Sequence, residues 1–186
     1  MEEIKKIVEI LQAGGIILYP TDTVWGIGCD PTNEQAVQKI YDLKRRADSK
    51  AMLLLTDSMA KVQAYVTDVP DVVWDLVECA EKPLTVIYPQ GRNLATNLMA
   101  QDGSVGIRIT NEAFSKQLCM RFKKPIVSTS ANVSGQPTPA FFDEISEEIK
   151  AGVDYIVQAR QEDREKKQPS SIIKFEKNGT FAIIRE

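Results

Sequence analysis

The residues with the clearest chemical potential form one stretch, 125–135, which reads PIVSTSANVSG. It begins as an apolar run typical of a strand and continues as a row of small hydroxyl and amide side chains. A strand that ends in a small polar loop before a helix often holds an anion in α/β proteins, because backbone N–H groups there can approach a phosphate. The same composition is typical of a turn-rich connection. The stretch by itself does not decide between an anion-binding loop and an ordinary connecting loop.

A second chemical signal is a set of cations. Lys44 ends the apolar stripe of a predicted helix, so its ammonium either snorkels to solvent, the commoner case, or points into a cleft. Arg46 and Lys50 belong to the cationic turn that follows, which is either a solvated helix C-terminus or part of an anion site. Arg108 lies on the open face of the predicted strand 104–109, where it is a surface charge or an anion clamp.

The chain contains no histidine, which excludes Ser-His-Asp and Cys-His catalysis, HExxH zinc sites and any imidazole base. It has no GxxxxGK[ST] phosphate loop and no GxSxG elbow. Gly26 and Gly28 give a GxG pair, but Pro31 stands where the dinucleotide fingerprint needs glycine. Chemistry must therefore rest on Lys, Arg, hydroxyl, carboxylate and backbone groups, or on the substrates themselves.

Cysteine usage and charge narrow the class of protein. Cys29, Cys79 and Cys119 are far apart, which argues against a disulfide framework or a zinc site and predicts reduced thiols, a cytoplasmic location and no metal held by the protein. The acidic, amphipathic N-terminus does not resemble a signal peptide, and no apolar run approaches transmembrane length. The net charge of -3 gives no sign of bulk nucleic-acid binding, so any basic site must come from local clustering.

The elements that must position these groups alternate along the chain. A length of 186 residues suits one domain over 1–186, and strand and helix patterns that alternate until a closing hairpin predict an α/β fold with a twisted mixed sheet flanked by helices. Helices are predicted at 2–13, 32–44, 58–66, 69–79, 111–122 and from 138. Strands are predicted at 16–19, 51–55, 84–88, 104–109, 154–157, 170–175 and 181–184, and from 125.

Three local features complete the expectation. Thr32 is predicted to cap its helix, and Thr138 with Pro139 is predicted to begin another. The core stripe of that second helix would be Phe141, Ile145 and Ile149. The highly charged segment 158–168 is predicted to be a flexible loop, either solvated or a lid over a substrate. Because loops of an open α/β sheet converge at one edge, the cations and hydroxyls together would suit an extended polyanion such as a nucleoside triphosphate.

Five motifs, taken in order, resemble the YrdC-like family. They are YPTDTVWGIGCD at 19–30, Lys44-x-Arg46 with Lys50, SVGIR at 104–108, PIVSTSANVSG at 125–135 and PSSII at 169–173. The match covers essentially the whole chain with suitable spacing, and the PTDT-x-x-G and STSAN-x-SG pieces together are specific. The chain departs from the family's usual residues at Ala47 and Ala51, which replace prolines, and at Thr110 and Trp25.

The resemblance implies a fold and an activity. The fold is a single-domain twisted sheet with a concave, positively charged face, in the short bacterial form. The activity is L-threonylcarbamoyladenylate synthesis, in which L-threonine, bicarbonate or CO2, and ATP give threonylcarbamoyl-AMP and pyrophosphate for N6-threonylcarbamoyladenosine modification of tRNA. The implied partners are tRNA and tRNA-threonylcarbamoyltransferase proteins, with double-stranded RNA binding a further expectation and no membrane. Mg2+ would be carried by ATP phosphates rather than by the protein.

The family's site residues carry over by motif. The KxR…SxN tetrad corresponds to Lys44, Arg46, Ser130 and Asn132. The ATP contacts correspond to Arg46, Lys50, Ser104, Ser130, Asn132, Thr138 and Arg185. The threonine contacts correspond to Thr23, Arg108, Ser128 and Ser171, with Arg108 as a partner for the carboxylate. Two alternatives stay open: a non-catalytic RNA-binding or assembly module, and a paralogue of the same fold with another nucleotide activity.

Overall fold

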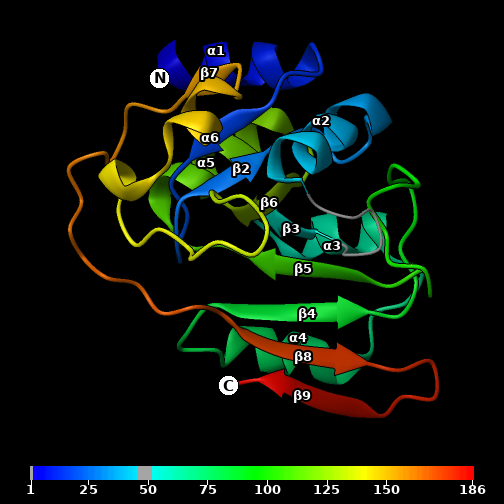
Figure 1. Cartoon of the computed structure of the whole chain (residues 1–186). Coiled ribbons are helices and arrows are strands. Elements are labelled where there is room, and N and C mark those ends of the chain that lie inside the picture. The colour runs from blue at the N-terminus through cyan, green and yellow to red at the C-terminus, as the bar shows by residue number, and fades with distance from the viewer. Residues whose placement is uncertain (1, 46–51) are drawn as a thin grey trace.

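A mixed sheet organises the chain. The structure, a computed structural model, describes residues 2–45 and 52–186, so the predicted site residues Arg46 and Lys50 lie outside the described residues. Within that part, nine strands hydrogen-bond in the order β7-β1-β2-β6-β3-β5-β4-β8-β9 (Figure 1). The strands are β1 Ile17–Tyr19, β2 Gly26–Gly28, β3 Leu53–Thr56, β4 Leu84–Tyr88, β5 Val105–Ile109, β6 Ile126–Ser130, β7 Tyr155–Ile156, β8 Ser171–Phe175 and β9 Phe181–Arg185.

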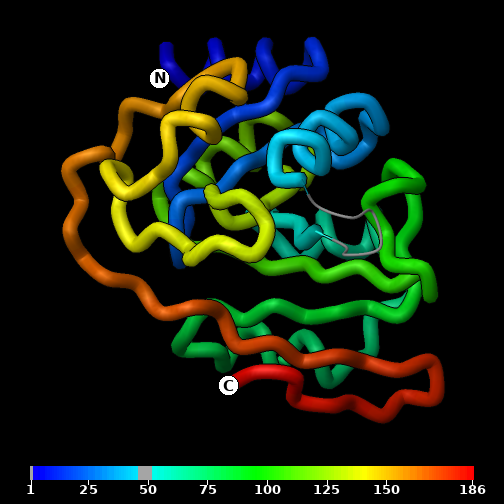
Figure 2. Tube along the Cα trace, viewed as in Figure 1, coloured from blue at the N-terminus to red at the C-terminus, as the bar shows by residue number. Residues whose placement is uncertain are grey.

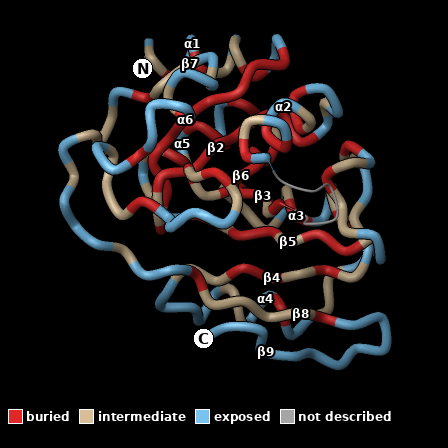
Figure 3. Tube along the Cα trace, in the orientation of Figure 1, coloured by how far each residue is buried: buried red, intermediate tan, exposed pale blue. Residues whose placement is uncertain are grey.

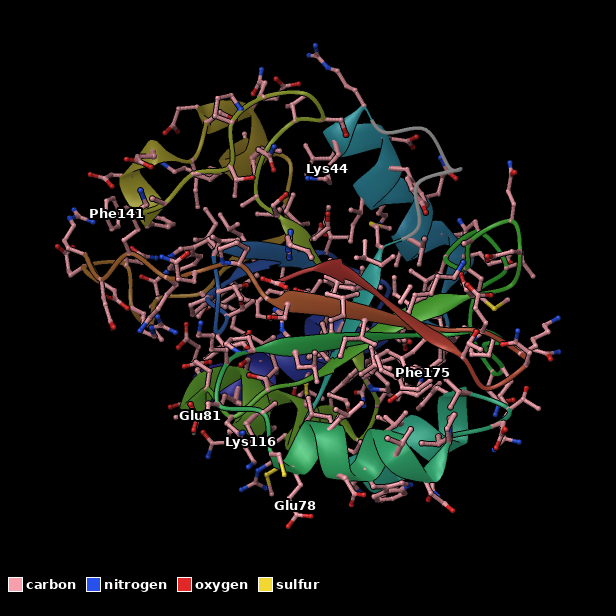
Figure 4. All side chains as sticks on the ribbon, turned by 90° about the horizontal axis from the view of Figure 1, so that it is seen from below. Lys44, Glu78, Glu81, Lys116, Phe141 and Phe175 are labelled. Atoms are coloured by element: carbon pink, nitrogen blue, oxygen red, sulfur yellow. The ribbon has the colours of Figure 1, made fainter. Side chains whose placement is uncertain are left out.

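Helices cover both faces of this sheet. They are α1 Glu2–Gln12, α2 Glu34–Lys44, α3 Met59–Tyr65, α4 Asp71–Glu78, α5 Ala113–Phe122 and α6 Glu147–Ala151, with a 3-10 turn η1 at Phe142–Glu144. Figure 4 shows α2 and the segment 131–151 on one face, where Lys44 and Phe141 are labelled, and α3, α4 and α5 on the other. No helix among the described residues is long and apolar enough to cross a membrane.

The arrangement confirms the predicted α/β class with a mixed twisted sheet. Parallel pairs join β1 to β7, β3 to β5 and β4 to β8, and the remaining pairs are antiparallel. Burial is highest in β1, β2, β6 and β3. In the C-terminal hairpin, β8 is half-buried except for the buried Phe175, and β9 is exposed (Figure 3). The segment 157–170 runs around the outside of the molecule to connect β7 with β8 (Figure 2).

The predicted helix from Thr138 is wrong. The chain stays irregular there, and α6 begins only after Ser146, whose hydroxyl accepts a hydrogen bond from the Ile149 N–H at 3.4 Å. The two prolines are compatible with a helix that starts at Pro139, but Phe141 has an extended backbone conformation (φ -131°, ψ 162°), which interrupts any such helix. Of the expected core stripe, Ile145 and Ile149 are buried, whereas Phe141 is partly exposed and lies against the Arg164 guanidinium.

Two smaller expectations are also corrected. Asn33, not Thr32, caps α2 by accepting a hydrogen bond from the Ala36 N–H at 3.0 Å, while the Thr32 hydroxyl donates to Asp30 at 2.6 Å. The segment 20–30, in which neither a helix nor a strand was predicted, contains β2 between β1 and β6. Its Gly28 is needed for that pairing, since a Cβ there would lie 2.6 Å from the carbonyl oxygen of Val127.

Candidate functional site

A cavity of about 720 Å³ lies on the sheet face that carries the segment 131–151. Its walls come from the loop before β2, from strands β3, β4, β5, β6 and β8, and from the segments around 138–140 and 166–170. Four basic side chains line it, namely Arg108, Lys166, Lys167 and Arg185, and none of the described lining residues is Asp or Glu. A space of this size and charge can accommodate a nucleotide together with a small second ligand.

The cavity collects many of the residues that the sequence singled out. The lining includes Thr23, Ser104, Arg108, Ser128, Ser130, Thr138 and Arg185. The alternation predicted for β5 is confirmed, because Ser104, Gly106 and Arg108 all line the cavity while Val105 and Ile107 are buried in the core. Lys44, Asn132 and Ser171 are not among the lining residues, and Arg46 and Lys50 lie outside the described part of the chain.

Arg108 forms the inner end of the cavity and is not a surface charge. It is 3% exposed, and its Nη2 lies 2.9 Å from Oδ1 of Asp22. The same Nη2 donates a hydrogen bond to the Thr23 hydroxyl at 3.3 Å. Its Nε has no hydrogen-bond partner among the described residues. The guanidinium is therefore held on one side while part of its donor capacity is unused by the protein.

A tight polar turn presents Thr23 to this guanidinium. The Thr21 hydroxyl accepts a hydrogen bond from the Thr23 N–H at 3.1 Å and donates one to the Val24 carbonyl at 2.7 Å. The two threonine hydroxyls are 3.1 Å apart. Because the Thr21 proton is directed at Val24, Thr23 is the donor in that contact and keeps a lone pair for Arg108.

Asp22 is the residue of this end that the sequence reading did not single out. Its carboxylate is largely buried behind Thr23 and Arg108 and is not among the cavity-lining residues. Burial raises the pKa of Asp22 above its ordinary value of 3.8, and the charge of Arg108 offsets part of that rise. The only available signal was its place between two threonines in the PTDT motif.

Lys44 does not snorkel to solvent. It is 1% exposed, and its ammonium donates hydrogen bonds to the carbonyl oxygens of Ser130 and Asn132, the second at 2.6 Å. The Ser134 N–H in turn donates to the Lys44 carbonyl at 2.8 Å. The end of α2 and the loop after β6 are thus joined by hydrogen bonds that each segment donates to the other. The ammonium of Lys44 therefore helps to determine the conformation of the loop.

Asn132 acts within the same loop. Its side-chain N–H groups donate to the carbonyl oxygens of Gln136 at 2.7 Å and Val133 at 3.2 Å. Thr138 follows at the exposed rim of the cavity, and Ser130 lines its wall at the end of β6. The loop is therefore shaped by the Asn132 amide and the Lys44 ammonium, and it presents the hydroxyls of Ser130 and Thr138 to the cavity.

The outer wall is built on the C-terminal hairpin. Arg185 donates from Nε to the Ser170 carbonyl at 2.8 Å and from Nη2 to the Ser170 hydroxyl at 3.2 Å. That hydroxyl is 2.9 Å from the hydroxyl of Thr85 on β4. Ser170 thus lies in the lining, whereas its predicted neighbour Ser171 does not.

The charged segment after β7 reaches the cavity as well. Lys166 and Lys167 line it, although no sequence pattern distinguishes them from the other charges of this segment. Upstream, Arg160 donates to the Thr21 carbonyl at 3.0 Å and forms ion pairs with Glu112 and Asp163 at 3.2 and 2.7 Å. The segment is the predicted loop, but these contacts attach it to the inner end of the cavity.

The lining does not suit a metal held by the protein. No group of three or more metal-ligating side chains occurs among the described residues. Mg2+ prefers carboxylate, carbonyl and phosphate oxygens, and the described lining offers hydroxyls and cations without a carboxylate. The described lining therefore offers no carboxylate ligand for Mg2+.

Sequence comparisons agree with the resemblance seen in the motifs. The Sua5_yciO_yrdC family model, described as "Telomere recombination", matches residues 9–186. The threonylcarbamoyl-AMP synthase of Pseudoalteromonas translucida is 36% identical over 153 residues, which cover 81% of this chain and 82% of that protein. The threonylcarbamoyl-AMP synthase of Vibrio parahaemolyticus is 31% identical over 175 residues, covering 92% of this chain and 94% of that protein.

Solved structures share the fold. E. coli YciO has a TM-score of 0.83 at 24% identity, over 98% of this chain and 88% of that one. P. abyssi Sua5 complexed with L-threonine has a TM-score of 0.82 at 21% identity, over 92% of this chain and 50% of that one. At these identities the likeness supports the architecture alone.

Proposed function

The chain belongs to the Sua5/YciO/YrdC family, and from that premise we propose that it is a threonylcarbamoyl-AMP synthase. The observation that carries the proposal is the cavity, in which a buried arginine that is hydrogen-bonded to a threonine hydroxyl shares one lining with further cations and serine hydroxyls. The arginine suits an amino acid, and the further cations and hydroxyls suit a nucleoside triphosphate. Both substrates would then lie in one continuous volume.

The inner end is assigned to L-threonine. Arg108 would bind the carboxylate, because a guanidinium recognises a carboxylate through paired N–H donors. Thr23 and Ser128 line the cavity nearby and would meet the polar groups of the amino acid. Ser171 would act here only through its neighbour Ser170, whose hydroxyl faces the cavity network.

The outer part is assigned to ATP. Ser104, Ser130, Thr138 and Arg185 line it and supply hydroxyl and guanidinium donors. Arg46 and Lys50 are proposed to add further cations. Lys44 and Asn132 are proposed to act by holding the loop that follows β6 in shape. Mg2+, carried by the phosphates, would neutralise charge that develops as pyrophosphate leaves.

The reaction can proceed without a protein base. The neutral amine of threonine adds to CO2 and gives a carbamate, and the proton that the nitrogen loses passes to water. A carbamate oxygen then attacks the α-phosphorus of ATP, and the bond to the leaving pyrophosphate breaks. The protein's part is to hold the two substrates in line and to stabilise the phosphate charge with fixed donors. This division of labour agrees with a chain that has no histidine.

The product defines the further partners. A mixed anhydride of a carbamate and AMP hydrolyses readily, so we propose that a tRNA-threonylcarbamoyltransferase consumes it to modify adenosine in tRNA. We also propose a cytoplasmic location, one YrdC-like domain over 1–186 and an ability to contact double-stranded RNA through the exposed lysines.

The test is pyrophosphate release with each substrate omitted in turn. A synthase releases pyrophosphate only when threonine, bicarbonate and ATP are all present, and mass spectrometry detects threonylcarbamoyl-AMP. Release without threonine would replace the proposal by another nucleotide activity of the same fold. Salt-sensitive RNA binding that ignores threonine, with no turnover, would indicate a binding module instead.

A further inference from the structure

The surroundings of Arg108 indicate a role for a residue that does not contact the substrate, and this inference rests on the proposed function. We propose that Asp22 is a positioning residue for amino-acid binding: it fixes the Arg108 guanidinium so that the unused donors of the guanidinium face the substrate carboxylate. Asp22 itself does not touch the substrate. It lies behind the cavity wall, whereas Arg108 and Thr23 are part of that wall.

The geometry supports a positioning role. Asp22 Oδ1 lies 2.9 Å from Nη2 of Arg108, and the side chains of the two residues are only 12% and 3% exposed. The same Nη2 donates a hydrogen bond to the Thr23 hydroxyl at 3.3 Å. The contact with Asp22 is a close ion pair, and Asp22 Oδ1 accepts no hydrogen bond among the described residues. An arginine held by its Nη2 alone retains Nε and Nη1 as donors. The absence of a described partner for Nε is what a guanidinium reserved for a ligand would show.

The charges around the pair explain why a carboxylate is used for this task. Arg108 is the cation that faces Asp22, and Glu112, at the start of α5, is a nearby anion. Glu112 is itself paired with Arg160 at 3.2 Å, so its charge is balanced from the other side. An unpaired buried guanidinium would be costly in the free enzyme and would attract any anion, including phosphate. Asp22 removes that cost and leaves a site suited to a zwitterion.

The ion pair between Asp22 and Arg108 also links the turn before β2 to strand β5. Asp22 lies between Thr21 and Thr23, whose hydroxyls and N–H groups form the closed turn before β2. Arg108 extends from β5, which is separated from β2 in the sheet by β6 and β3. The ion pair therefore fixes the distance between the two walls of the inner end. Losing it should alter threonine binding more than ATP binding.

The experiment compares three variants by calorimetry with L-threonine and with ATP, and by the three-substrate pyrophosphate assay. Asp22→Asn removes the charge, and Asp22→Glu keeps the charge but displaces it. The matched control is Asp30→Asn, since Asp30 is also a largely buried aspartate with a lysine partner, Lys124 at 2.7 Å, and does not line the cavity. L-threoninamide, which lacks the carboxylate, is the second probe.

We expect Asp22→Asn to weaken threonine binding about 10- to 100-fold while ATP binding changes less than about twofold. The preference of the protein for threonine over L-threoninamide should shrink by a similar factor. Asp22→Glu should recover part of the threonine affinity, and Asp30→Asn should leave both affinities unchanged. These outcomes would separate positioning from a general loss of structure, which would weaken both ligands.

Unchanged threonine affinity in Asp22→Asn would overturn the inference, and so would an equal loss of threonine and ATP binding. If Asp22→Asn does not fold, Asp22→Glu decides alone: a selective loss of threonine affinity supports the inference, and no selective loss overturns it. The proposed function fails separately, when the unaltered protein binds threonine but releases no pyrophosphate with all three substrates present.

Discussion

The two ends of the cavity are built in different ways. At the inner end, Arg108, Asp22, Thr21 and Thr23 are buried or nearly so, and an ion pair and side-chain hydrogen bonds link them to one another. At the outer end, the side chains lie nearer the surface, and the shape of the loop after β6 depends on carbonyl oxygens held by Lys44.

The difference suits the two ligands proposed for this cavity. A small amino acid offers few contacts, so its site must be rigid before the ligand arrives. A triphosphate offers many oxygens and a strong charge, so flexible cations and backbone donors can adapt to it. We therefore expect substitutions at the inner end to act on threonine alone and those at the outer end to act on ATP.

The largest effect is expected from Arg108→Met. It removes the carboxylate partner and leaves Asp22 buried without its cation, so kcat/KM for threonine should fall about 1,000-fold, with a loss of about 3 kcal/mol in unfolding free energy. Steady-state kinetics and urea denaturation measure the two changes. Lys124→Met, which leaves the buried Asp30 without its lysine partner, controls for removing the cation from a buried aspartate elsewhere. A normal KM for threonine in Arg108→Met would dismiss the assignment of the inner end.

The next effect is expected from Lys44→Met. It removes the donor to the carbonyls of Ser130 and Asn132, so the loop loses its shape, and kcat/KM for ATP should fall about 10- to 100-fold while threonine affinity is retained. The matched control is Lys39→Met on the same helix, because Lys39 also donates to a backbone carbonyl, that of Gly14 at 2.9 Å. An equal effect of both variants on ATP would mean that Lys44 stabilises α2 generally.

The smallest effect is expected from the double variant Lys166→Ala/Lys167→Ala. These cations line the cavity from an outlying segment, so their loss should raise KM for ATP about three- to fivefold at low ionic strength and less at high salt. The pair Lys5→Ala/Lys6→Ala on α1 removes the same charge away from the cavity. If KM for threonine rises instead, the segment acts on the inner end through Arg160.

The sequence predicted the elements better than their contacts. Alternation in β5 placed Ser104 and Arg108 on one face, and the structure confirms it. The role of Asp22 could not be predicted, because its partner Arg108 lies 86 positions later in the chain. No local sequence pattern indicates that the two residues are in contact. Lys44 was correctly placed on an inward stripe, but its acceptors are backbone carbonyls, which any sequence supplies.

Other errors have equally specific causes. The helix from Thr138 was predicted from a good cap and a helical spacing, but the backbone is extended at Phe141, which no local pattern in the sequence indicates. Lys166 and Lys167 were indistinguishable in sequence from their charged neighbours, since only the path of the segment from β7 to β8 brings them to the cavity. Hydrophobic periodicity predicts which face of a helix or strand is buried. The features that were missed depend instead on the path of segments that have no regular secondary structure.

That route has a consequence for how the protein is made. The cavity takes its walls from Thr21 through Arg185, and the sheet must pair β1 with β7 and β4 with β8 before it is complete. Pairing between strands so distant in sequence is a slow step in folding. During synthesis, nearly the whole chain must leave the ribosome before either substrate has a place to bind. Substrates can therefore retard unfolding of the finished protein, but they cannot guide the early steps of its folding.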